Sequence, residues 1–131
     1  MLSLSSSVRI FAARERVDFR KGIDGLHAIV RDQFGEDALS GNVFLFFNAR
    51  RDRVKVLVWD RNGFWLFMKR LERGKFQRLD GTSAKLEIDR ARLTMLLDGI
   101  DTKNSSFYRY SVRDVRIAAR DDAARRTRAL G

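Results

Sequence analysis

The clearest pattern of apolar and polar positions lies between Asn42 and Phe76, in the segment NVFLFFNARRDRVKVLVWDRNGFWLFMKRLERGKF. Three runs rich in β-branched and aromatic residues are separated by two short polar loops, and runs of this kind and length predict β-strands. We expect these strands at residues 43–47, 54–59 and 64–70. The dipeptide Asn62-Gly63 predicts a two-residue turn between the last two strands. The segment therefore predicts an antiparallel meander.

Both faces of the predicted hairpin are apolar. With a turn at Asn62-Gly63, Trp59 faces Leu66 and Val58 faces Phe67. Side chains alternate between the faces, which carry Leu57, Trp59, Phe64, Leu66 and Met68 on one side and Val54, Val56, Val58, Trp65 and Phe67 on the other. Such a sheet is either covered on both sides or uses one face as an interface.

Helical spacing of apolar residues predicts two helices outside the meander. The first begins near Asp18, which we expect to be its N-cap. Its apolar stripe comprises Phe19, Ile23, Leu26, Ile29 or Val30, and Phe34. The second helix, RARLTMLLDG, follows Asp89 as N-cap and stops at Gly99. With short strands expected at 8–12 and 85–88, the order predicts an α+β fold, an antiparallel three- to five-stranded meander sheet packed against two helices.

The chain of 131 residues is long enough for one domain with its own hydrophobic core. We expect this domain over residues 1–102. Residues 103–131 are polar, rich in arginine and without a continuous apolar face. They predict a basic, mobile C-terminal tail that orders on binding.

Missing residue types exclude several classes of site. The chain has no cysteine, which excludes disulfides, thiolate metal sites and thiol catalysis. Its single histidine, His27, excludes zinc sites that need two imidazoles. No apolar run reaches the roughly 18 residues of a membrane-spanning helix, and the N-terminus lacks a secretory signal. We expect no metal, no cofactor and no membrane partner, a cytoplasmic location, and leave the oligomeric state open.

Positive charge is concentrated in two parts of the chain. The net charge is +10, from 27 basic and 17 acidic residues, with a local +7 over residues 48–78 and +5 over residues 103–131. This balance favours an anionic partner, most plausibly nucleic acid, although excess charge also serves solubility.

The meander brings two basic clusters to the same end of the sheet, because the middle strand starts where the third strand ends. The first loop contributes Arg50, Arg51 and Arg53, and the segment after the third strand contributes Lys69, Arg70, Arg73, Lys75 and Arg78. Together they predict one patch that neutralises several phosphates of DNA. The strand aromatics Phe44, Phe46, Trp65 and Phe67 also suggest a stacking platform for bases, although strand aromatics are more often core.

Catalytic chemistry has little support in the sequence. Three acidic residues gathered in space can hold a divalent metal for phosphoryl transfer, but the aspartates are scattered, and several are explained as helix caps or turn residues. His27 lies near the apolar stripe of the first helix, which is typical of a packed residue. We therefore expect no catalytic residue and no enzyme; a metal-dependent nuclease remains the least favoured alternative.

Three blocks, DFRKGIDGL, LSGNVFLFFNARRDRVKVLVWDRNGFWLFMKRLERGKF and LTMLLDGID, match a known family in order and spacing. Over residues 1–103 the chain resembles the small accessory proteins of the insertion-sequence-sixty-six class of bacterial transposable elements, the TnpB-type products of the second open reading frame. The resemblance implies a role in transposition beside a separate, larger DDE-type transposase. It identifies a process rather than a mechanism.

The chain departs from the family pattern at its loops. It lacks the glycines that commonly flank the arginine pair of the first hairpin loop, and it contains no proline. We expect the fold to persist and the geometry of that loop to differ.

Residues and resemblance together predict a non-catalytic accessory protein that binds DNA, at element ends, through the eight basic residues and assists the transposase. The alternative is a protein-interaction module that binds the transposase without direct DNA recognition. An uncovered apolar sheet face favours this alternative.

Overall fold

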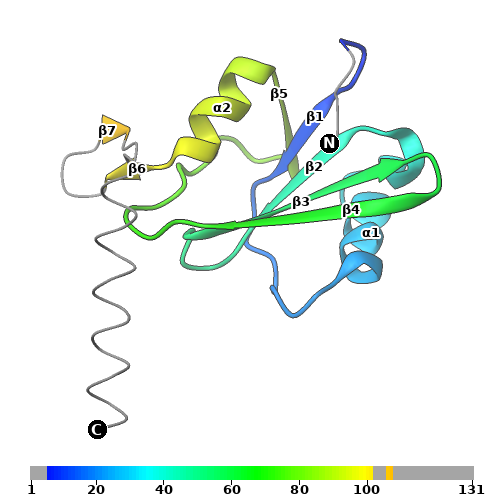
Figure 1. Ribbon diagram of the computed structural model, residues 1–131, viewed down its shortest axis with the longest axis horizontal. Helices are drawn as coiled ribbons and strands as arrows, with labels where there is room; N and C mark the ends of the chain where they lie inside the picture. The colour runs from blue at the N-terminus through cyan, green and yellow to red at the C-terminus, as the bar shows by residue number, and fades with distance from the viewer. Residues whose placement is uncertain (1–5, 102–105, 108–131) are drawn as a thin grey trace, which may run out of the picture.

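The computed structural model describes residues 6–101 and 106–107, and a five-stranded sheet forms its centre (Figure 1). The strands are β1 (Ile10–Ala13), β2 (Val43–Phe47), β3 (Arg53–Asp60), β4 (Gly63–Arg70) and β5 (Lys85–Ile88), in the spatial order β4-β3-β2-β1-β5. All neighbours are antiparallel except β1 and β2, which run parallel. The α+β prediction is confirmed. The sheet is mixed because a helical crossover separates β1 from β2, as parallel neighbours require.

Two helices cover opposite faces of the sheet. Helix α1 (Ile23–Asp32) belongs to the crossover, and α2 (Arg90–Asp98) follows β5. The structure also contains the short 3₁₀ helix η1 (Ala38–Ser40) and the two-stranded pair β6 (Ile100–Asp101) and β7 (Ser106–Phe107). No helix in the described residues is long and apolar enough to cross a membrane.

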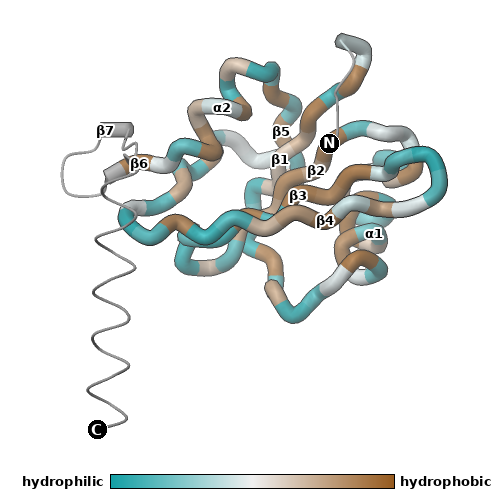
Figure 2. Tube along the Cα trace, in the orientation of Figure 1, coloured by the Kyte–Doolittle hydropathy of each residue, from teal (hydrophilic) through white to brown (hydrophobic). Residues whose placement is uncertain are grey.

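The buried side chains form two clusters because alternate residues of each strand point to opposite faces. On one face Leu26, Val30 and Phe34 of the α1 region pack against Phe11, Phe44, Phe46 and Leu57. On the other face Leu96 of α2 packs with Ile10, Leu45, Val54, Val58, Leu71 and Phe76. Figure 2 shows the apolar segments along β1, β2 and β3, between the helices. Burial on both sides explains why these strands are almost continuously apolar.

The β3–β4 hairpin has the predicted faces but a different turn. Asp60 pairs with Gly63, so Arg61 and Asn62 form the two-residue loop, and Arg61 takes the left-handed conformation with φ +58°. Trp59 therefore faces Phe64, their rings meeting edge-on at 5.0 Å, and the predicted cross-strand pairs are wrong. Each predicted pair is displaced by an even number of positions, which leaves every side chain on its predicted face.

The predicted caps have different outcomes. Helix α1 begins at Ile23 with Gly22 as N-cap, so the prediction for Asp18 is wrong. The Asp18 carboxylate instead accepts hydrogen bonds from the backbone and guanidinium of Arg20, which lower its pKa to about 2. Asp89 is confirmed as the N-cap of α2, since its carboxylate accepts from the Arg92 backbone N–H at 2.7 Å.

Gly99 ends α2, as predicted, with φ +74°. A Cβ at this position would lie 2.7 Å from the Leu71 side chain, so both conformation and space require glycine. The predicted tail at 103–131 lies outside the described residues, apart from Ser106 and Phe107 in β7.

The substitution Asp89→Ala removes the oxygen that satisfies the first turn of α2. We expect the free energy of unfolding to fall by about 1 kcal/mol. Urea unfolding followed by tryptophan fluorescence measures this change. The control Thr94→Ala, on the exposed side of the same helix, should remain within about 0.5 kcal/mol of the parent protein. An unchanged unfolding midpoint for Asp89→Ala would show that the cap contributes nothing in solution.

Candidate nucleic-acid interface

The loop between β2 and β3 is organised by Asn48. Its side-chain oxygen accepts hydrogen bonds from the backbone N–H groups of Asp52 and Arg53 at 3.1 and 3.0 Å, and its amide donates to the Asp52 carboxylate at 2.6 Å. Arg51 adopts a left-handed φ of +56° and donates its backbone N–H to the Asn48 carbonyl. Asparagine side chains stabilise turns in this way. The loop is therefore held in one shape without flanking glycines.

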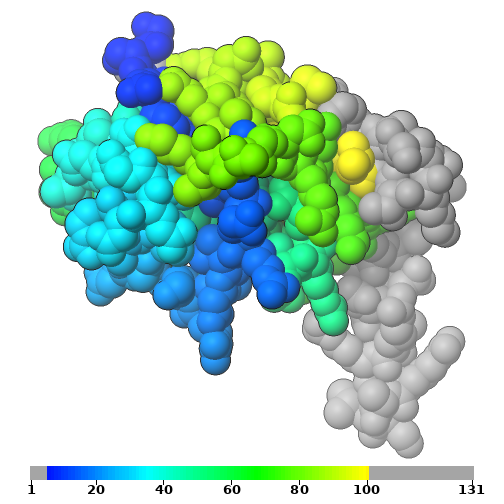
Figure 3. All heavy atoms as spheres, turned by 180° about the vertical axis from the view of Figure 1, so that it is seen from behind, coloured from blue at the N-terminus to red at the C-terminus, as the bar shows by residue number. Residues whose placement is uncertain are grey.

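Backbone hydrogen bonds tie this loop to the segment that follows β4. Leu71 N–H donates to the Asp52 carbonyl and Phe76 N–H to the Arg51 carbonyl, both at 2.7 Å. In the space-filling view from behind, the segment after β4 lies against the β2–β3 loop (Figure 3). The predicted convergence of the two basic clusters at one end of the sheet is thus confirmed.

Seven of the eight predicted residues have exposed side chains and form what we call the basic patch: Arg50, Arg53, Lys69, Arg70, Arg73, Lys75 and Arg78. Arg53 and Arg70 lie directly opposite each other in the β3–β4 register. Arg70 forms an ion pair with Glu72 at 2.9 Å, and Lys69 donates to the Leu97 carbonyl at 2.6 Å. Like charges opposite each other in a sheet repel, and a bound anion relieves that repulsion.

Arg51, the eighth residue, is buried, with only 6% of its surface exposed. Its guanidinium donates to the carbonyls of Phe76 (3.2 Å from Nε) and Gln77, and lies 4.4 Å from the centre of the Phe47 ring. Burial, and secondarily the charge of Arg78, lower its pKa to about 10, so it stays charged at neutral pH. Arg51 therefore stabilises the loop beneath the basic patch, and its side chain does not belong to the exposed surface.

The predicted stacking aromatics divide into two groups. Phe44 and Phe46 are fully buried, so the prediction of a stacking role is wrong for both. Trp65 and Phe67 are 48% and 43% exposed and stack on each other at 5.8 Å with an interplanar angle of 10°. They share a face of β4 with Lys69. An exposed aromatic pair thus borders the basic patch.

Acidic and imidazole groups are dispersed. Asp60 accepts a hydrogen bond from the Trp65 indole at 3.1 Å, and Asp18 and Asp89 have the local roles described above. His27 packs against the Phe64 ring at 5.5 Å, as expected for a half-buried residue of α1. In residues 6–101 and 106–107, no group of three histidine, cysteine or acidic side chains is placed to hold a metal ion.

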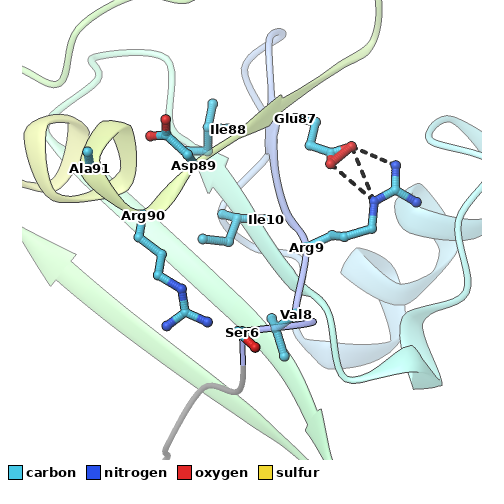
Figure 4. Close-up of a pocket in the computed structure, with 9 residues that line it drawn as sticks. All are labelled: Ser6, Val8, Arg9, Ile10, Glu87, Ile88, Asp89, Arg90 and Ala91. Carbon is cyan, nitrogen blue, oxygen red and sulfur yellow. Dashed lines mark hydrogen bonds and ion pairs between the residues drawn. The ribbon is translucent and has the colours of Figure 1, made fainter.

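A hollow of about 650 Å³ lies where β1 and β5 meet the start of α2, at the end of the sheet remote from the basic patch (Figure 4). Val8, Ile10 and Ile88 provide its apolar lining. At its rim Arg9 forms an ion pair with Glu87 at 2.6 Å. Asp89 and Arg90 also line the hollow, so its two basic and two acidic residues balance and give it little attraction for an anionic ligand.

Comparison with known proteins gives one family and uncharacterised relatives. The family model described as IS66 Orf2 like protein matches residues 8–106. The uncharacterized protein y4jC of Sinorhizobium fredii (strain NBRC 101917 / NGR234) is 35% identical over 101 residues, covering 77% of this chain and 86% of its own length. The uncharacterized protein y4hO of the same strain is 34% identical over 104 residues, covering 79% of this chain and 90% of its own length. No solved structure matches the chain.

The substitution Arg51→Ala should destabilise the fold, whereas Arg50→Ala should not. Loss of the buried guanidinium leaves the Phe76 and Gln77 carbonyls without their donors, and we expect unfolding to become easier by about 2–3 kcal/mol. The exposed neighbour should change stability by less than about 0.5 kcal/mol.

Arg51→Lys should not restore stability, because an ammonium is a point donor and cannot reproduce the planar fork of a guanidinium. Urea unfolding of the three variants compares them directly. Equal midpoints for Arg51→Ala and Arg50→Ala would contradict the structural role of the buried side chain.

Proposed function

The chain belongs to the IS66 Orf2-like family, and on this premise we propose that it supports transposition by binding DNA. Family membership implies an accessory role in transposition. We infer that the protein is non-catalytic and acts in the bacterial cytoplasm, binding the ends of the element and assisting a separate transposase. The observation that carries this proposal is the basic patch, in which seven exposed cations from two chain segments gather at one end of the sheet.

The patch suits phosphate binding because the backbone at several of its positions is held by hydrogen bonds. Arg53 and Arg70 project from paired strands, and the loop that carries Arg50 is held by the Asn48 side chain. Buried Arg51 adds a further positive charge beneath the surface. Contacts to phosphates supply affinity and strong salt dependence more readily than sequence specificity. We therefore expect the patch to position the protein on DNA.

A preference for unpaired bases over duplex must come from groups other than the basic patch. Trp65 and Phe67 border the patch, and exposed aromatic rings can stack on unpaired bases. We therefore propose the aromatic pair, rather than the arginines, as the groups that distinguish unpaired bases from ordinary duplex.

The double substitution Arg50→Ala/Arg53→Ala should weaken DNA binding without unfolding the protein, because both side chains are exposed. Fluorescence anisotropy with a duplex carrying the terminal repeat, across a salt series, measures affinity and salt dependence. Loss of two phosphate contacts should lower the magnitude of the slope of log K against log salt by about 2.

The matched control is Arg9→Ala/Arg31→Ala, which removes the same charge from exposed positions outside the patch. It should retain the slope of the parent protein. Equal losses of DNA affinity in both variants would show that net charge alone causes the effect. Normal DNA binding by Arg50→Ala/Arg53→Ala would show that the binding site lies outside the basic patch. A scrambled duplex separates end recognition from binding that ignores sequence.

The second candidate function is a protein-interaction module that binds the transposase without DNA recognition. It is favoured by the exposure of three apolar side chains on β4: Trp65, Phe67 and Met68. Exposed apolar groups of this kind mark protein contacts. Co-elution with the transposase after nuclease treatment, together with normal binding by the Arg50→Ala/Arg53→Ala variant, would support this function over the first.

A further inference from the structure

The two edges of the sheet differ in length and in protection. Strand β5 has four residues, and its Lys85 and Glu87 side chains form ion pairs with Glu36 and Arg9. Strand β4, at the other edge, has eight residues and pairs without interruption to β3. In the described part of the chain no strand pairs with the outer side of β4. Long edge strands of this kind are templates for pairing with another chain.

The outward backbone groups of β4 can be identified from the hydrogen bonds of its ends. Leu71 N–H donates to Asp52 across the β3–β4 ladder. In an antiparallel pair, successive residues alternate between pointing their N–H and C=O groups toward the partner and away from it. Residues 65, 67 and 69 therefore bond to β3. The backbone groups of Phe64, Leu66, Met68 and Arg70 point outward.

Residues 63–68 of strand β4 lack the usual devices that prevent edge pairing, and the two charged residues of the strand, Lys69 and Arg70, stand at its end. Natural edges carry charged residues, proline or a bulge, whereas residues 63–68 are GFWLFM. Their register with β3 contains no bulge. Trp65, Phe67 and Met68 are 48%, 43% and 60% exposed, so apolar side chains accompany the unpaired backbone. This combination indicates a surface that is covered in the working protein.

We propose that the occupant is a second copy of this chain, with the two β4 strands paired antiparallel about a two-fold axis at Leu66. In this register every backbone hydrogen bond between the copies joins residues whose N–H and C=O groups point outward. Leu66 pairs with Leu66 of the second copy, and Phe64 pairs with Met68 of the second copy. Six backbone hydrogen bonds form, about two for each of the three directly bonded pairs. Two five-stranded sheets become one continuous sheet of ten strands.

The side chains of this register are compatible with one another. Trp65 lies opposite Phe67 of the second copy, which extends the existing stack of the two rings. Lys69 lies opposite Gly63 of the second copy, and Arg70 opposite Asn62 of the second copy. No like charges are directly opposed, and cross-strand aromatic pairs stabilise sheets. The strand is thus complementary to itself.

The net charge of +10 on each copy does not forbid this pairing. Arg70 of one copy and Arg70 of the other lie eight positions apart along the strand direction, a separation of about 27 Å at about 3.4 Å per residue. The Debye length is about 8 Å at physiological ionic strength, so the two basic patches are screened from each other. We expect association to strengthen with salt, which is the opposite of the expectation for DNA binding.

Sedimentation equilibrium of the full chain without DNA, at two salt concentrations, tests the proposal independently of the proposed function. Met68→Pro removes an outward N–H and places a ring on the outer edge, while the hydrogen bonds to β3 remain. It should weaken self-association at least about tenfold, which corresponds to about 1.4 kcal/mol. The control Met68→Ala keeps the N–H and should still dimerise. A parent protein that is monomeric at both salt concentrations overturns the proposal.

The register has its own test, since the chain has no native cysteine. Leu66→Cys places two thiols opposite each other, with Cα atoms about 5.5 Å apart, within reach of a disulfide. Mild oxidation should yield a covalent dimer. The neighbouring variant Phe67→Cys lies opposite Trp65 of the second copy and should yield little. Cross-linking of Phe67→Cys in preference to Leu66→Cys overturns the two-fold axis at Leu66.

Discussion

A buried positive charge, which has no carboxylate partner among the described residues, holds together the end of the sheet that carries the basic patch. The guanidinium of Arg51 satisfies the carbonyls of Phe76 and Gln77 and rests on the Phe47 ring. The Arg51 carbonyl in turn accepts from the Phe76 N–H. One residue thus binds the segment after β4 through both its side chain and its backbone. The positions of Arg50, Arg73, Lys75 and Arg78 depend on that junction, because they lie on the two segments it joins. The other three residues of the basic patch are positioned by the β3–β4 pairing.

The strands and the second helix could be predicted because local patterns determine them. The apolar runs of β2, β3 and β4 have one interpretation at that length, and Asp89 and Gly99 mark α2 with standard cap chemistry. The start of α1 could not be predicted from Asp18, because Arg20 captures its carboxylate in a local turn. The parallel pairing of β1 with β2 depends on a crossover, which residue periodicity does not reveal.

The sequence predicts where the candidate site lies on the sheet, but it does not predict which of the basic residues are exposed there. A meander brings the two basic segments together whatever the details of its loops. Which arginine turns inward depends on the left-handed backbone at Arg51 and on the two carbonyls beneath it, both of which are tertiary properties. Asn48 was the available signal: an asparagine at the start of a tight loop can replace glycine by bonding to the backbone. In this loop the hydrogen bonds of the Asn48 side chain compensate for the absence of the glycines that are common in the family.

The position of β1 between β2 and β5 has a consequence during protein synthesis. Its pairing partners in β5 leave the ribosome last among the strands of the sheet, since Arg9 and Glu87 are 78 residues apart in the chain. Until then β1 of the nascent chain is paired only with β2. Helix α2, which covers one face of the sheet, is also missing. The domain therefore completes its core only after α2 has emerged, late in translation, and a nascent chain that stalls before Lys85 presents an open sheet to chaperones.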